Sequence, residues 1–161
     1  MKHTLAVLVE NHPGVLSRVS GLFSRRGYNI ESLVVSETED SSVSRMTIVV
    51  SGDKAIIEQV TKQLNKLIDV IKVTDLTNEE AVNRQLLLVR VAADNTTRGE
   101  IVQLMDIFRA RVVDIGRRSM VIEATGDEKK IQAIIKSLQP FGIQELAKTG
   151  TLAMLRGSKE K

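Results

Sequence analysis

The order of apolar runs along this chain repeats one plan twice, and this repeat limits the possible folds more than any other feature. In the first half, four apolar runs typical of strands enclose two segments that have the apolar spacing of a helix. The strand-like runs are residues 4–9, 30–35, 46–50 and 68–76, and the helical segments are residues 14–26 and 53–67. The order strand-helix-strand-strand-helix-strand predicts a ferredoxin-like βαββαβ domain.

The second half repeats this order after a polar break. We expect strands around residues 86–92, 112–115 and 120–124, helices around 97–108 and 127–138, and one or two closing strands within 143–155. The expected fold class is therefore α+β, with two ferredoxin-like βαββαβ domains. We place the first domain at residues 1–76, a linker at 77–83 and the second domain at 84–161.

Local signals mark where the expected helices begin and end. Asp53 and Asp127 each precede a helical segment and are expected to act as N-caps. Thr97 and Glu100 have the spacing of a capping box at the third helix. Gly27 follows the first helix, where a left-handed residue commonly ends a helix.

Composition narrows the class of protein. The chain has 161 residues, 42% of them hydrophobic, so it can fill folded cores. It has no cysteine, which removes disulfides and thiolate chemistry, and no run near the roughly 20 apolar residues of a membrane helix. The net charge of +3 comes from 23 basic and 20 acidic residues and barely favours an anionic partner. We expect a cytoplasmic protein that binds neither membranes nor nucleic acid.

A search for catalytic patterns finds none. His3 and His12 are the only histidines, and neither has a histidine or cysteine at metal-ligand spacing. No phosphate-binding G-x-x-x-x-G-K-[ST] motif occurs. We therefore predict no catalytic residue, no metal and no cofactor in this chain.

One loop does have the character of a binding site. It is Glu10-Asn-His-Pro-Gly-Val-Leu16, which leaves the first strand and starts the first helix. Unpaired N–H groups at a helix start bind carboxylates, Gly14 lets a ligand approach the backbone, and Asn11 offers a donor and an acceptor. The alternative is that Pro13 and Gly14 only shape the helix start and that Asn11 caps it. If Gly14 has helical dihedral angles, Gly14→Asp should leave the fold intact.

The run ENHPGVLSRVSGLFSRRGYNIESL, residues 10–33, resembles the signature of the acetohydroxyacid (acetolactate) synthase small subunits, and the resemblance continues along essentially the whole chain. It implies that the first domain is an ACT domain and that the second is a C-terminal domain specific to these small subunits. It also implies a regulatory chain whose partner is the large catalytic subunit. Thiamine diphosphate, magnesium and FAD would belong to that large subunit.

The same resemblance implies an amino acid effector and a homodimer. In ACT domains the effector lies between two paired domains, and valine is the commonest inhibitor for a chain with a single copy of this unit. Carried over by motif, the effector-binding residues are Asn11, Gly14, Val15 and Leu16 of one copy with Asn29 and Ile30 of the other.

Two other classes share parts of this pattern. RNA recognition motifs have the same element order, but they need aromatic residues on their central strands, and the runs 5–9 and 46–50 have none. An amino-acid-responsive transcription regulator would add a helix-turn-helix unit, and both halves instead alternate strands with helices.

Overall fold

The computed structural model describes residues 1–157, so the last four residues of the expected second domain lie outside the described part. The chain divides into two units. The first unit runs from Met1 to Val82 and also takes the segment from Thr151 onward, and the second unit is Asn83–Gly150. The elements of the first unit are β1 (Lys2–Glu10), α1 (Val15–Arg26), β2 (Asn29–Glu37), β3 (Val43–Ser51), α2 (Lys54–Asn65), β4 (Val70–Asp75) and β9 (Leu152–Leu155).

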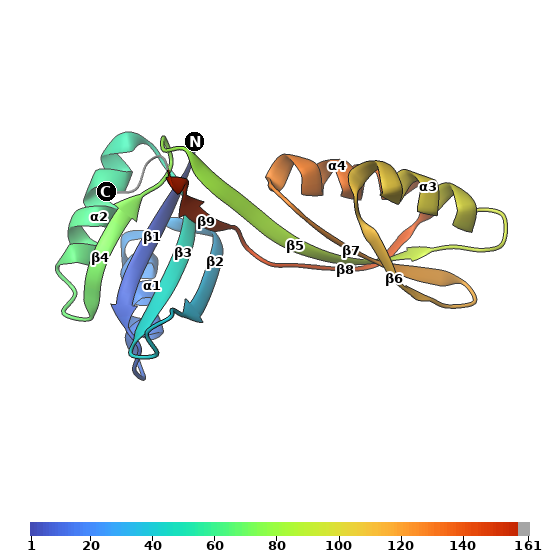
Figure 1. Cartoon of the computed structure of the whole chain (residues 1–161). Coiled ribbons are helices and arrows are strands. Elements are labelled where there is room, and N and C mark those ends of the chain that lie inside the picture. Colours follow the sequence, from blue (N-terminus) through green and yellow to red (C-terminus); the bar gives the residue numbers. More distant parts are fainter. Residues whose placement is uncertain (158–161) are drawn as a thin grey trace. The chain divides into compact units, whose positions relative to one another are not determined.

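The first sheet has the strand order β2-β3-β1-β4, with every neighbouring pair antiparallel. Helices α1 and α2 cover one of its faces (Figure 1). Side chains alternate along a strand, so Leu5, Val7 and Val9 of β1 enter the core beneath the helices while Ala6 and Leu8 face the other side. Phe23 of α1 is 1% exposed and is among the largest side chains of this core. The expected ferredoxin-like order is confirmed.

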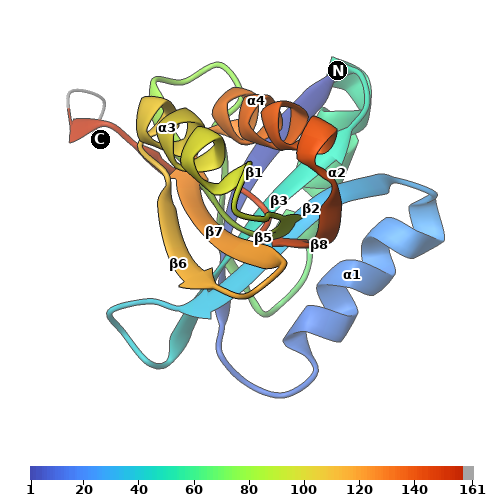
Figure 2. The ribbon, with the colours of Figure 1, turned by 90° about the vertical axis from the view of Figure 1, so that its right-hand side faces the viewer.

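The second unit repeats this architecture (Figure 2). Its elements are β5 (Ala81–Ala92, which begins in the first unit), α3 (Arg98–Phe108), β6 (Arg111–Ile115), β7 (Ser119–Gly126), α4 (Glu128–Leu138), a 3-10 turn at Gln139–Phe141 and β8 (Ile143–Lys148). The strand order β6-β7-β5-β8 matches that of the first sheet. Within residues 1–157 no helix has the length and apolar character needed to span a membrane.

The helix ends confirm most of the local signals. The carboxylates of Asp53 and Asp127 accept hydrogen bonds from the backbone N–H groups three residues on, both at 2.9 Å. Gly27 ends α1 with a φ of 68°. The capping box expected at Thr97 is wrong, because its side chain makes no capping bond. The Thr97 Oγ1 atom instead accepts the backbone N–H of Asp94 at 3.0 Å.

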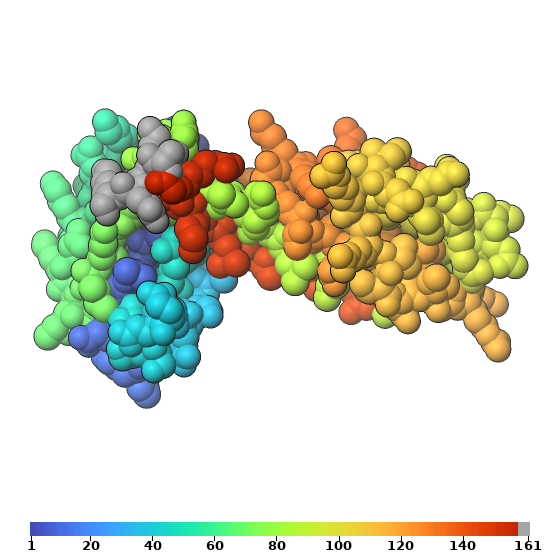
Figure 3. Space-filling model, viewed as in Figure 1, coloured from blue at the N-terminus to red at the C-terminus, as the bar shows by residue number. Residues whose placement is uncertain are grey.

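The position of the C-terminal strand differs from the one that the expected domain division gives it. Residues 143–155 do form two strands, but β9 packs in the first unit, beyond the boundary drawn at residue 84. Ala153 lies 3% exposed against Ala6 and Leu76. Figure 3 shows this segment in red against the first unit. The polar break at 77–83 is also shorter than expected, since β5 begins at Ala81. Ala153 is buried on a sheet face whose residues are distant in the sequence, so no local sequence pattern indicated its position.

Candidate functional site

The loop between β1 and α1 depends on the backbone of Gly14. Its φ is 89° and its ψ is −12°, a left-handed conformation that glycine adopts without steric cost. A Cβ atom built on Gly14 would lie 3.2 Å from the Arg18 Nη1 atom. The helix therefore begins at Val15, and the expectation that Gly14 could have helical dihedral angles is wrong.

The start of α1 presents unpaired donors. Within residues 1–157 the backbone N–H groups of Gly14, Leu16 and Ser17 have no hydrogen-bond partner, and no side chain caps the helix. The Val15 N–H reaches the His12 carbonyl oxygen only at 3.5 Å. These N–H groups and the positive end of the helix dipole together favour a bound carboxylate.

A buried carboxylate anchors this loop to the rest of the first unit. Asp69, whose side chain is 7% exposed, accepts from Arg18 Nε and Nη2 at 2.6 Å through Oδ2. Its Oδ1 lies 2.8 Å from His12 Nε2. The sequence predicted no role at this loop for either Arg18 or Asp69. Arg18 could have been found, because it lies one helical turn after Gly14, whereas Asp69 lies 51 residues from Arg18 and gave no local signal.

The same cluster has the composition of a small metal site. Ligand atoms of Glu10, His12 and Asp69 all lie within 4.8 Å of one another. The Arg18 guanidinium already forms an ion pair with the Asp69 carboxylate, and its positive charge repels a cation at this position. We therefore interpret the cluster as a set of ion pairs. The hydrogen bond to the Pro13 carbonyl, with smaller contributions from Glu10 and Asp69, raises the pKa of His12 above 6.5.

We expect an NMR pH titration to find the His12 pKa above 6.5 in the folded chain. Because folding raises this pKa, the stabilisation is fully present below pH 6.5 and is lost as the pH rises through the folded-state value. Asp69→Asn should lower the His12 pKa only in part, since the Pro13 carbonyl is the largest cause. Glu58→Gln on α2 is the matched control. A wild-type His12 pKa below 6.5 would contradict the geometry.

Asn11 fastens the loop to the hairpin between β2 and β3. Its Nδ2 donates to the Ser41 carbonyl at 2.9 Å and to Glu37 Oε1 at 3.3 Å. Its backbone N–H donates to the Ser42 carbonyl at 2.8 Å. Within the described residues the Oδ1 atom of Asn11 has no partner, so an acceptor remains available beside the helix start.

Val15 and Leu16 differ in what they can offer a ligand. The Val15 side chain is 3% exposed and packs in the core, so only its backbone can reach a ligand. The Leu16 side chain is 45% exposed beside the unpaired N–H groups and can contact an apolar ligand group.

Asn29 and Ile30 lie at the opposite end of the sheet. Asn29 pairs with Ser51, which in turn pairs with Lys2 at the start of β1, whereas the Gly14 loop follows the end of β1. A nine-residue strand separates these two ends, which corresponds to about 25 Å. The structure thus brings together Asn11, Gly14, Val15 and Leu16, but it does not bring Asn29 and Ile30 to them within one chain.

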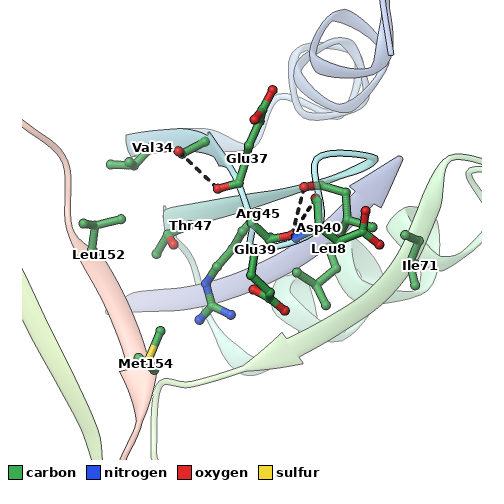
Figure 4. Close-up of a pocket in the computed structure, with 13 residues that line it drawn as sticks. Leu8, Val34, Glu37, Glu39, Asp40, Arg45, Thr47, Ile71, Leu152 and Met154 are labelled. Atoms are coloured by element: carbon green, nitrogen blue, oxygen red, sulfur yellow. Dashed lines mark hydrogen bonds between the residues drawn. The ribbon is translucent and has the colours of Figure 1, made fainter. Parts of the chain in front are cut away.

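A separate pocket of about 570 Å³ lies on the sheet face that α1 and α2 leave uncovered (Figure 4). Leu8 and Thr47 come from the central strands, Ile71 from β4, and Leu152 and Met154 from β9. The Glu37–Asp40 part of the hairpin forms an acidic rim. The sequence reading did not predict this pocket, because β9 forms one of its walls.

Comparison with known proteins assigns both units. A family model described as the AHAS small subunit-like ACT domain matches residues 5–72. A second model, described as the small subunit of acetolactate synthase, matches residues 84–157. The probable acetolactate synthase small subunit of Archaeoglobus fulgidus is 61% identical over 160 residues, which cover 99% of this chain and 100% of the relative.

Further relatives agree over nearly full length. The acetolactate synthase small subunit of Bacillus subtilis is 49% identical and covers 100% of this chain, with 94% of the relative covered. The crystal structure of the acetolactate synthase small subunit from Thermotoga maritima matches with a TM-score of 0.90 at 42% identity, over 97% of this chain and 98% of that one.

The first unit is thus an ACT domain, and the protein is of the ACT-domain regulatory class. More particularly, the chain belongs to the family of acetolactate synthase small subunits, which regulate and do not catalyse, in branched-chain amino acid biosynthesis. The resemblance first noted in residues 10–33 is confirmed.

Proposed function

We propose that this chain binds valine between the ACT domains of two copies and thereby inhibits the catalytic large subunit of acetolactate synthase. The left-handed Gly14, with unpaired N–H groups beside it and the Arg18 guanidinium close by, is the observation that carries the proposal. The thiamine diphosphate, magnesium and FAD needed for catalysis lie on the large subunit in this proposal.

Each part of an α-amino acid has a complementary group at this site. The effector carboxylate accepts from the unpaired N–H groups at the helix start, with the Arg18 charge close by. The ammonium donates to the Asn11 Oδ1 atom, an acceptor that has no partner among the described residues, while the Asn11 Nδ2 donates to the hairpin. The isopropyl group contacts Leu16, which is half exposed in the single chain.

The geometry of one chain supports a site shared between two copies. Valine is much shorter than the roughly 25 Å between the Gly14 loop and Asn29 of the same chain. Asn29 and Ile30 can therefore complete the site only from a second copy. A homodimer paired through the ACT domains supplies two such sites related by its twofold axis.

Inhibition follows if valine binds the inactive arrangement of the complex better than the active one. Couplings between sites are commonly about 1–3 kcal/mol. The Asp69–Arg18–His12 ion pairs connect the loop to the α2–β4 connection, so the loop cannot move without straining this part of the first unit.

We expect calorimetry to detect valine binding to the purified chain. Valine at a hundredfold excess over its dissociation constant should stabilise the folded chain by about 2.7 kcal/mol, seen as a higher Tm. Isobutylamine, which lacks the carboxylate, and α-ketoisovalerate, which lacks the ammonium, are matched controls and should bind at least tenfold more weakly. Absence of both heat and stabilisation with valine would refute the proposal.

A further inference from the structure

The pocket on the uncovered face of the first sheet, drawn in Figure 4, is lined in part by apolar side chains that are exposed to solvent. Ile71 is 54%, Leu152 52% and Met154 64% exposed in the single chain. Contiguous apolar side chains at a surface mark a place where another molecule binds.

The floor of the pocket holds a polar group without a partner. Thr47 is 1% exposed, and its Oγ1 atom has no hydrogen-bond partner within residues 1–157. A buried hydroxyl left unpaired costs about 1–3 kcal/mol, a cost that an incoming donor or acceptor removes. The pocket therefore favours an occupant that brings a polar group to an otherwise apolar floor.

The rim of the pocket is acidic although the chain as a whole is basic. Glu37, Glu39 and Asp40 follow one another around it. Hydrogen bonds from the side chain and backbone of Ser42 hold the pKa of Asp40 below its ordinary value, so this carboxylate is charged at neutral pH. Arg45 is the one basic residue among the described lining residues, and its Nη2 donates to the Ala153 carbonyl at 2.5 Å. A positively charged group fits this rim.

The face already holds one extended segment. Strand β9 lies on it with Ala153 buried and held by Arg45. An extended backbone with small or apolar side chains is thus a shape that this surface accepts.

Two other occupants fit less well. Small-molecule sites commonly bury 70–90% of their ligand, whereas this pocket has walls that are about half exposed. A second copy docked face to face about a twofold axis would bring two acidic rims together, and like charges oppose that contact.

We propose that this face docks an extended apolar segment of the catalytic large subunit that carries a basic residue. The proposal rests on membership of the small-subunit family, and it does not rest on the valine site. Ile71, Leu152 and Met154 take the apolar side chains, Glu39 and its neighbours take the basic residue, and Thr47 hydrogen-bonds the segment.

The test measures association of the full-length chain with its large subunit by biolayer interferometry at two salt concentrations. Ile71→Glu and Glu39→Lys should each weaken association about tenfold or more. Glu39→Lys should also reduce the salt dependence. Glu58→Lys, the same charge reversal on α2 at the opposite face of the sheet, is the matched control and should associate normally.

Thr47→Val should have opposite effects on the stability of the free chain and on its association with the large subunit. Removing an unpaired buried hydroxyl should raise the Tm of the free chain, while loss of the hydrogen bond to the partner should weaken association. Valine titration of every variant reports separately on the proposed effector site. The docking proposal is overturned if Glu39→Lys and Thr47→Val associate as tightly as the wild type. It is equally overturned if Ile71→Glu splits an oligomer of the isolated chain and leaves large-subunit binding unchanged.

Discussion

Gly14→Asp is expected to abolish inhibition by valine and to lower the stability of the first unit by about 1–2 kcal/mol. The stability cost arises because the φ of 89° is unfavourable for any residue with a Cβ, although aspartate and asparagine tolerate it better than most. The loss of inhibition is expected because the new carboxylate would lie where we propose that the effector carboxylate binds, within reach of the Arg18 guanidinium.

Gly14→Asn separates these two effects. It imposes a similar size and a similar backbone strain but adds no charge, so it should lose a similar amount of stability and keep a weakened response to valine. The measurements are the valine concentration for half inhibition of the reconstituted enzyme and the Tm of each variant. If Gly14→Asp binds the large subunit and remains fully sensitive to valine, the effector does not use this helix start.

Mixing two inactive variants should restore valine binding. Gly14→Asp damages the loop and Asn29→Ala damages the strand from the other copy, so each variant alone should bind valine poorly. In a heterodimer of the two variants both defects fall in one site, and the second site contains only wild-type residues. Random exchange of subunits should therefore restore about one quarter of all sites in an equal mixture.

The readout is the stoichiometry of valine binding by calorimetry before and after unfolding and refolding the mixture. A mixture of Gly14→Asp with Asn11→Ala is the matched control, since both changes affect the same half of the site and no intact site can form. If the first mixture also stays inactive after proven subunit exchange, the two halves do not come from different copies.

Local chemistry explains which features could be predicted from the sequence. Asp53 and Asp127 cap helices through bonds to residues three positions away, so the signal and its effect lie together in the sequence. Thr97 had the same kind of signal, but its hydroxyl accepts the backbone N–H of Asp94 in the preceding loop and does not cap the helix. The order of strands and helices followed from apolar spacing alone, because each element buries one face.

The site depends on contacts that sequence spacing does not encode. Arg18, beside the left-handed Gly14, is held by Asp69, which lies in the connection between α2 and β4. The family resemblance supplied the predicted effector residues. It did not supply the separation of Asn29 from the loop, which follows from strand register. Predicting the pocket near Thr47 would have required the position of β9. The packing of β9 depends on residues over a hundred positions away in the sequence.

The return of β9 to the first unit has a consequence for synthesis on the ribosome. The four strands β1 to β4 can pair as soon as they emerge, but the residues that complete this unit are made only after the whole of Asn83–Gly150. At usual rates of translation that delay is several seconds. During this time the nascent ACT sheet has Ala6 and Leu76 bare on its uncovered face, so the first unit is complete only when its last strand has been translated.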